Sequence, residues 1–341
     1  MKASYFIKSV TIAISFLAII TVTANADKNQ YYKNNPSIVR VKKTVAKYKT
    51  ESRSNQDGTY HRGDFVKIAS VDRKNLKTSS GYYITANKDF VSKTAGYQNP
   101  KRYHQVNYTQ IKPQGKVGHD IGVGYEGIKV NKVMRHLGTY GGYNKYNYST
   151  KYAVERFQKS HGLKVTGRVN ETTWIKMGLK KSQWTSIDAY VAPLGARAWQ
   201  GRKAHIEAAI HQAYKYMGNP YLVGASSAPY YGTDCSGLAM QALYAGGINP
   251  LPVSSIHHGY PGNEWNSRNL FADKHFKHVR YANRQRGDLI FYYQPGTHIV
   301  WHVALYLGGN RVIESWPPRI MVQPVKNGQR SIIAGVARPW N

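Results

Sequence analysis

The sequence predicts a multi-domain chain with a small all-β domain, a central three-helix bundle and a C-terminal α+β domain. The chain has 341 residues, enough for two or three domains of about 100–150 residues each. Hydrophobic residues make up 41 % of the total, too many for a wholly disordered chain. Hydrophobic spacing is that of short strands first, then of helices, and finally of both types.

The first 26 residues indicate a cleaved signal peptide. Two lysines, Lys2 and Lys8, precede an apolar run over residues 10–22, and residues 24–26 have the small-residue pattern that signal peptidase needs. The alternative is a membrane anchor, but the run is shorter than the roughly 20 apolar residues of a spanning helix. We therefore expect a secreted protein that begins at Asp27 and keeps no integral membrane segment.

The chain is strongly basic, with 48 Lys and Arg against 17 Asp and Glu and a net charge of +31. A secreted cation meets polyanions, and the candidates are teichoic acids, acidic membrane lipids and stray nucleic acid. Nucleic acid is the weakest candidate, because the sequence has no arginine-rich helix, RNP-like aromatic pattern or zinc finger. The alternative is a basic surface that serves only solubility.

Cysteine usage limits the chemistry further. The only cysteine is Cys235, which excludes an intramolecular disulfide framework and a cysteine-cluster zinc site. Nothing in the sequence indicates a metal or another cofactor.

Residues 27–99 have the pattern of an all-β domain. We expect one strand over 39–48, another over 65–69, and a closing hairpin formed by 81–85 and 89–91. A tyrosine strand, an Arg-Gly-Asp turn, a paired-tyrosine strand and a final Phe-Val resemble the SH3-like surface-layer attachment modules of lactobacilli. The resemblance implies docking to anionic wall polymers such as teichoic acids; the alternative is a spacer domain. The lysines that would follow such a polymer as point charges are Lys42, Lys43, Lys47, Lys49, Lys67, Lys74 and Lys77.

A polar, proline-containing stretch over residues 100–117 is interpreted as a linker, and helical spacing follows over residues 118–181. The first predicted helix has an apolar face from Val130 to Leu137. We expect Ser149 or Thr150 to cap the second helix and Asn170 to cap the third. Between the first two helices lies a stretch rich in Tyr and Asn, residues 140–152, that is longer than this connection needs.

The central segment also carries a family pattern. The run 150–158, followed by 161–163, 166–167 and 171–173, resembles the three-helix peptidoglycan-binding domain. The simplest interpretation of Phe157 and Trp174 is that both belong to the core. Binding would then depend on other, exposed polar and aromatic groups.

Residues 200–341 contain the side chains that indicate catalysis. A predicted helix from Gly201 to Met217 precedes a glycine-rich loop, after which Asp234-Cys235-Ser236-Gly237 leads into the apolar run 238–245. Cys235 is therefore expected at or just before a helix N-terminus. The helix dipole and unpaired amides there favour the reactive thiolate and are placed to receive an oxyanion. The alternative is that Cys235 is an inert buried hydrophobe.

A thiolate nucleophile needs a neighbouring base, and His302 is the main candidate. His302 lies at the start of a predicted strand over 300–307, where it alternates with apolar neighbours. A hairpin through residues 308–310 would bring Glu314 back toward His302, so that Glu314 accepts the second N–H of the imidazole and fixes its tautomer. The alternative bases, none on a predicted strand, are His257, His258 and His298.

Together these motifs resemble the NlpC/P60 cysteine peptidases. The resemblance rests on residues 218–221, 234–237, 286–288 and 302–308. It implies a papain-like α+β fold and hydrolysis of peptidoglycan stem peptides, commonly between γ-D-glutamate or D-isoglutamine and the diamino acid. By position it implies catalytic roles for Cys235 as nucleophile, His302 as general base and Glu314 as third residue, and substrate-binding roles for Tyr221, Asp234 and Ser236. The family usually has His, Asn or Gln where this chain has Glu314.

We therefore expect a secreted, cell-wall-associated thiol protease whose partners are peptidoglycan stem peptides and anionic wall polymers, with no role for nucleic acid. Two alternatives stay open. One is a wall-binding or adhesive protein whose C-terminal domain no longer catalyses. The other is an N-acetylmuramoyl-L-alanine amidase, which would cut between the sugar and L-Ala.

Overall fold

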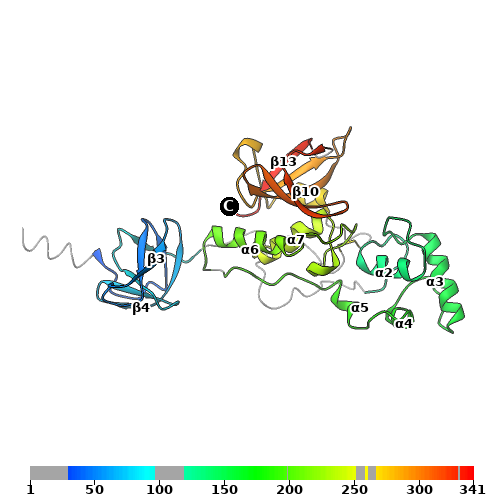
Figure 1. The fold of residues 1–341 in the computed structure, drawn as a ribbon, viewed down its shortest axis with the longest axis horizontal. Coiled ribbons are helices and arrows are strands. Elements are labelled where there is room, and N and C mark those ends of the chain that lie inside the picture. Colours follow the sequence, from blue (N-terminus) through cyan, green and yellow to red (C-terminus); the bar gives the residue numbers. More distant parts are fainter. Residues whose placement is uncertain (1–29, 97–118, 198, 251–257, 260–265, 329–330) are drawn as a thin grey trace, which may run out of the picture. The chain divides into compact units, whose positions relative to one another are not determined.

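A computed structural model describes residues 30–96, 119–197, 199–250, 258–259, 266–328 and 331–341 (Figure 1). The predicted signal peptide and the whole of the predicted linker lie outside this description. No helix within the described residues is long and apolar enough to cross a membrane. The chain divides into two compact units, one containing residues 1–98 with 198–201 and the other residues 99–197 with 202–341.

The first unit is all-β, as predicted. Its seven strands form one sheet in the order β3-β2-β6-β5-β4-β1-β7, and the paired strands are antiparallel. Val39, Leu76, Ile84 and Val91 are fully buried in its core. The strands are β1 (Ile38–Val41), β2 (Val45–Tyr48), β3 (Gln56–Tyr60), β4 (Phe65–Asp72), β5 (Asn75–Thr78), β6 (Tyr83–Thr85) and β7 (Val91–Lys93).

Two strand predictions for this unit are wrong. The expected single strand over residues 39–48 is two strands, because the amides of Lys42 and Lys43 both turn to the carbonyl of Phe90. The expected closing hairpin is absent from the described residues, since β6 pairs with β2 and β5 whereas β7 pairs with β1 at the sheet edge.

The central part of the second unit is helical. Its helices are α2 (Ile128–His136), α3 (Tyr148–Ser160), α4 (Glu171–Lys176) and the short α5 (Gln183–Ser186). Trp174 and Tyr146 are fully buried between them. Asn170 caps α4 as predicted, by accepting the amide of Thr173 at 2.9 Å. The cap of α3 is Asn147 rather than Ser149 or Thr150: its side chain accepts the amide of Thr150 at 2.9 Å, so the helix begins earlier than expected.

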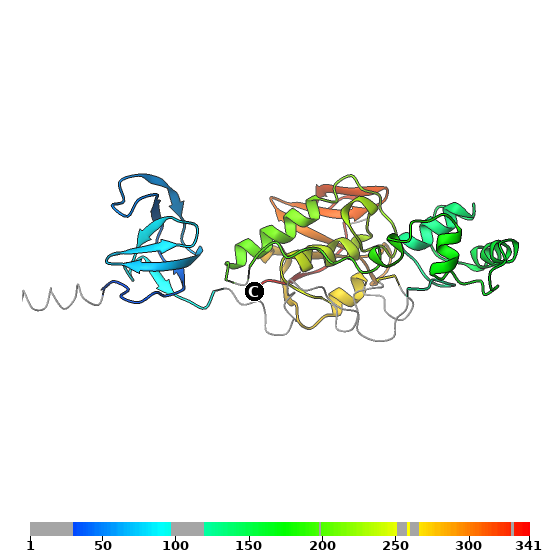
Figure 2. The ribbon, with the colours of Figure 1, turned by 90° about the horizontal axis from the view of Figure 1, so that it is seen from below.

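The C-terminal part packs helices on an antiparallel six-stranded sheet, in agreement with the predicted α+β arrangement. The strand order is β12-β11-β10-β9-β13-β8. Helices α6 and α7 lie on one side of this sheet, and α7 packs directly against β10 and β11 (Figure 2). The elements are α6 (Arg202–Tyr214), α7 (Cys235–Ala245), α8 (Ser267–Ala272), β8 (Lys277–Val279), β9 (Leu289–Tyr293), β10 (Val300–Gly308), β11 (Arg311–Trp316), β12 (Arg319–Pro324) and β13 (Ile333–Arg338).

The Arg-Gly-Asp segment at 286–288 joins the helices to the sheet. Arg286 makes two hydrogen bonds to the carboxylate of Glu207 on α6, at 2.7 and 2.8 Å. The fully buried Asp288 receives two hydrogen bonds from Arg338 on β13, at 2.9 and 2.8 Å. Gly287 has a positive φ of 92°, and a Cβ there would lie 2.7 Å from Ile206. This segment of the family pattern therefore has a structural role.

Candidate active site

Cys235 is the first residue of α7, as the sequence predicts. The helix begins here because Asp234 adopts an extended conformation and its carboxylate accepts the amide of Gly237 at 2.7 Å. Close packing also fixes this turn, since a Cβ on Gly237 would lie 2.0 Å from the carbonyl oxygen of Ala225. The start of α7 is thus set by its cap and by the adjacent loop.

The sulfur of Cys235 faces the backbone of β10 on both sides of His302. Its thiol is 4.0 Å from the carbonyl oxygen of Trp301 and also interacts with the backbone N–H of Val303. A register shift between Val300 and His302 marks a β-bulge at this point of the strand. Bulges redirect side chains next to functional sites, and this bulge brings the Trp301 carbonyl to the nucleophile.

The helix N-terminus is not the main influence on the pKa of Cys235 in this structure. Burial, followed by the negative charge of Asp234, raises the pKa of the Cys235 thiol to about 12. Hydrogen bonds from the backbone N–H groups of Val303 and Ser236 act in the opposite direction but are weaker. The thiol is therefore protonated at neutral pH, and its proton has to leave as the sulfur attacks.

His302 and Glu314 form a buried pair on neighbouring strands. The imidazole Nε2 lies 2.6 Å from the Glu314 carboxylate, and each side chain is 1 % exposed. The pair meets because β10 and β11 are joined by a hairpin in which Gly309 and Asn310 both have positive φ, 56° and 59°. Such a two-residue turn matches the twist of the strands. The predicted hairpin and the predicted approach of Glu314 to His302 are both found.

A groove of about 630 Å³ opens at the nucleophile. Cys235, Asp234 and Ser236 line it from the start of α7, with Tyr221 from the preceding loop and Trp301 from β10. Burial and then the neighbouring Cys235 and Asp234 raise the pKa of the Tyr221 hydroxyl, so this group is a hydrogen-bond donor at all working pH values. His302 is not among the residues that form the groove surface.

Asp234 is held by several donors. Besides the Gly237 amide, it accepts the Ser236 hydroxyl at 3.0 Å and the Gly224 amide at 2.9 Å, and both oxygens lie 3.0 Å from Nε2 of His258. Burial alone would raise the pKa of Asp234, but the charge and hydrogen bond of His258 and the other donors lower it. Asp234 therefore remains ionised and orders the segment around Cys235.

The alternative bases differ in position. His258 lies in the groove but its Nε2 is directed to Asp234 and Ser236. His298 packs edge-on against Tyr293, with ring centroids 5.3 Å apart, outside the groove lining. His257 lies outside the described residues. No group of three or more His, Cys, Asp or Glu side chains suitable for a metal ion occurs among the residues for which coordinates are described.

The groove also contains residues that the sequence did not predict. Among them are Glu126, Tyr143 and Lys145, which come from the central helical part. Tyr143 and Lys145 belong to the Tyr- and Asn-rich stretch between α2 and α3, and Glu126 forms an isolated β-bridge with Lys145. In the sequence, the unexpected length of this stretch was the feature that could have pointed to these residues. It indicated extra structure but did not say which surface that structure would meet.

The family comparisons agree with this geometry. Residues 218–331 match the NlpC/P60 family, and residues 129–177 match the family described as "Putative peptidoglycan binding domain". Residues 31–91 match a domain of unknown function, DUF5776. The C-terminal domain is therefore an NlpC/P60 domain and the central one a peptidoglycan-binding domain. The SH3-like character of the N-terminal domain stays a prediction.

Curated relatives match part of the chain. The peptidoglycan endopeptidase RipB of Mycobacterium tuberculosis is 31 % identical over 134 residues, covering 36 % of this chain and 48 % of RipB. The bifunctional muramidase/DL-endopeptidase CwlT of Bacillus subtilis is 28 % identical over 132 residues, covering 38 % of this chain and 35 % of CwlT. The chain thus spans less than half the length of either relative.

Solved structures also match part of the chain. The P60 domain of an antigen from Mycobacterium avium subspecies paratuberculosis is 25 % identical, with a TM-score of 0.30, and covers 41 % of this chain and 98 % of that domain. The RipB structure is 23 % identical, with a TM-score of 0.29, and covers 57 % of this chain and 82 % of that one.

Proposed function

We propose that this protein is a secreted, cell-wall-associated cysteine endopeptidase that cleaves peptidoglycan stem peptides. The observation that carries the proposal is the position of the Cys235 sulfur at the start of α7, against the β10 backbone on both sides of His302, at the edge of a groove. The similarity to the named peptidoglycan endopeptidase RipB supports the substrate class.

The proposed reaction begins with a neutral thiol. Because Nε2 of His302 contacts Glu314, Nδ1 is the nitrogen we assign to the proton of Cys235. As this proton moves to Nδ1, the sulfur attacks the amide carbonyl, and backbone N–H groups at the start of α7 stabilise the oxyanion. The imidazolium then protonates the leaving amine, and a thioester remains. Water, deprotonated by His302, hydrolyses the thioester and releases the acid and the thiol.

The proposed roles of the remaining site residues follow from their places in the groove. Tyr221 presents a hydroxyl donor near the nucleophile, and we assign it to the substrate carbonyl or its oxyanion. Asp234 and Ser236 order the first turn of α7 and line the groove, where we propose that they contact the amino-terminal side of the stem peptide. The proposed bond lies between γ-D-glutamate or D-isoglutamine and the diamino acid, which agrees with the DL-endopeptidase name of CwlT.

The N-terminal domain is proposed to bind anionic wall polymers such as teichoic acids. A hollow of about 610 Å³ on this domain is lined by Arg40, Lys42, Lys43 and Arg62, with Asp89 as its only acidic lining residue. Cations gathered at a hollow attract a phosphodiester chain, and the attraction weakens as salt screens it. We expect retention on isolated walls to fall as the salt concentration rises.

Digestion of purified peptidoglycan tests the function. The wild-type protein should create new amino termini on the diamino acid, identified by mass spectrometry, and Cys235→Ala should create none. His302→Ala should lose at least a thousandfold in rate, because the thiol then has no acceptor for its proton. His298→Ala is the matched control, since His298 lies outside the groove, and should cleave at the wild-type rate.

The same digestion separates the alternatives. New ends between the sugar and L-Ala would establish an amidase. Equal release of peptides by wild type and Cys235→Ala would establish a wall-binding protein without cysteine catalysis. Loss of activity in His258→Ala but not in His302→Ala would move the base to His258.

A further inference from the structure

We propose that the peptidoglycan-binding domain is part of the active site: Tyr143 and Glu126 of this domain form one wall of the catalytic groove and contact the substrate peptide. The proposal deepens the proposed function and rests on it. The proposal gives the central domain a role in cleavage. A domain that only targets the enzyme would affect cleavage of insoluble cell wall alone. A domain that forms one side of the groove affects cleavage of every substrate, including a short soluble peptide.

This wall of the groove is a small unit held together by hydrogen bonds. Glu126 and Lys145 face each other across an isolated antiparallel bridge, and the Tyr143 hydroxyl donates to Oε1 of Glu126 at 3.2 Å. Lys145 Nζ lies 3.8 Å from the same oxygen. All three residues line the groove that also contains Cys235 and Tyr221. The wall therefore presents a carboxylate and a hydroxyl to the space in which the nucleophile acts.

The electrostatics of the tyrosines agree with this proximity. Burial, and next the carboxylate of Glu126, raises the pKa of Tyr143 to about 12, and the charge of Asp234 adds to the effect. The pKa of Tyr221 is raised by burial and then by Cys235, Asp234, Tyr143 and Glu126. Charged groups from the central domain thus act on the residues next to the nucleophile.

Hydrogen bonds to backbone carbonyls hold the groove wall against the catalytic loops. The buried Asn144 donates its amide to the carbonyl of Val223 at 2.6 Å, and to that of Gly127 at 3.3 Å. The segment it holds, residues 221–224, begins with the groove residue Tyr221. On the other side the amide of Glu126 donates to the carbonyl of Gly259, the neighbour of His258.

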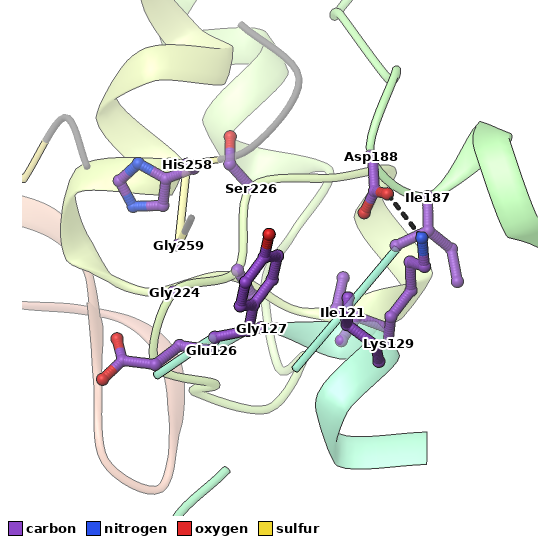
Figure 3. A pocket seen from close by; sticks show the side chains of 13 residues that line it. Ile121, Glu126, Gly127, Lys129, Ile187, Asp188, Gly224, Ser226, His258 and Gly259 are labelled. Carbon is purple, nitrogen blue, oxygen red and sulfur yellow. Dashed lines mark hydrogen bonds and ion pairs between the residues drawn. The ribbon is translucent and has the colours of Figure 1, made fainter. Parts of the chain in front are cut away.

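The contact between the central helical part and the catalytic loops is closely packed. A Cβ on Gly127 would lie 2.8 Å from the carbonyl oxygen of Gly224, and a Cβ on Gly224 would lie 2.5 Å from Cβ of Glu126. Figure 3 shows Gly127 and Gly224 side by side at a cavity of about 30 Å³, with the Glu126 side chain pointing away from it. On the far side of this cavity Lys129 and Asp188 form an ion pair of 2.8 Å.

The chemistry of the wall indicates which part of a substrate it recognises. A carboxylate and a tyrosine oxygen accept hydrogen bonds, so the matching groups on a peptide are N–H donors. Such donors are either the ammonium of a free amino terminus or backbone amides. Lys145 and Arg268 also line the groove, so the wall offers directed acceptors beside cations rather than a uniformly negative surface.

The experiment uses the full chain and a soluble stem peptide that ends with the diamino acid, prepared with a free or an acetylated amino terminus. The variants are Tyr143→Ala and Glu126→Gln. The matched control is Tyr152→Ala, since Tyr152 is also about half exposed on the central domain but does not line the groove. For each variant kcat/KM, the melting temperature and sedimentation with whole walls are measured.

We expect Tyr143→Ala and Glu126→Gln to lower kcat/KM on the soluble peptide by about tenfold or more, the usual cost of losing a hydrogen bond to a charged partner. The melting temperature and the sedimentation with whole cell walls should stay unchanged, and Tyr152→Ala should match the wild type in all three measurements. If kcat/KM falls only with the peptide that has a free amino terminus, the donor is the ammonium group. If kcat/KM falls equally with the free and the acetylated peptide, the donors are backbone amides.

If Tyr143→Ala and Glu126→Gln both cleave the soluble peptide as well as Tyr152→Ala does, the central domain has no part in catalysis and the proposal is overturned. This result differs from failure of the proposed function itself, in which the wild-type protein would cleave neither peptide.

Discussion

Replacing Glu314 by Gln tests how the catalytic histidine is supported. The change keeps the shape of the side chain and an oxygen that can accept from Nε2 of His302, but it removes a full negative charge at 2.6 Å. During the proposed attack His302 becomes an imidazolium, and Glu314 is the carboxylate beside it. Glu314→Gln should therefore slow the chemical step more than it weakens substrate binding.

The magnitude follows from the geometry. With charge centres about 4 Å apart and an effective dielectric constant of about 20, the attraction is about 4 kcal/mol, which is an upper limit of about a thousandfold in rate. The retained hydrogen bond and relaxation of a neutral side chain reduce this difference, so we expect kcat to fall about tenfold to a hundredfold. Glu314→Leu removes the acceptor as well and should reach the upper limit.

Steady-state kinetics on a soluble stem peptide provide the assay. Because the lost charge acts on the imidazolium that forms during the attack, kcat should fall in Glu314→Gln while KM stays near the wild-type value. An unchanged kcat would show that Glu314 does not support the base.

Two further predictions concern stability and the resting state of the thiol. Arg338→Ala should lower the free energy of unfolding, measured by urea denaturation, by about 3–5 kcal/mol. The reason is that the buried carboxylate of Asp288 loses its charged partner. The control is Arg268→Ala, at an exposed position, which should lower the free energy of unfolding by less than about 0.5 kcal/mol. The ultraviolet absorbance of a thiolate, taken as wild type minus Cys235→Ala, should be absent at pH 7 and appear only as the pH approaches the raised pKa of about 12. A thiolate signal at neutral pH would contradict the neutral-thiol mechanism.

The sequence predicted the elements that local chemistry determines. Cys235 was expected at or just before a helix N-terminus, and α7 begins at Cys235 because Asp234 caps it. Gly309 and Asn310 tolerate positive φ, so the β10–β11 hairpin and the approach of Glu314 to His302 follow from the turn. These predictions are confirmed because the residues that decide them are neighbours in sequence.

Predictions that depended on distant contacts were less successful. The strand expected over residues 39–48 is interrupted because Lys42 and Lys43 bond to Phe90, almost fifty residues later. The ionisation of Cys235 depends on distant contacts in a similar way. A helix N-terminus is visible in the sequence, but the burial of Cys235 against β10 is not, and burial has the larger effect on its pKa.

The groove wall shows why a domain pattern alone is an incomplete guide to function. The family pattern of the central domain comes from its helices, whereas Tyr143 and Asn144 lie in the connection between them. Connections tolerate insertions, so their length carries little fold information, yet they lie on the surface and are placed to meet a neighbour. Here the neighbour is the loop that carries Tyr221, and the side-chain amide of Asn144 donates to its Val223 carbonyl. Because that contact joins two family patterns, it appears in neither pattern alone.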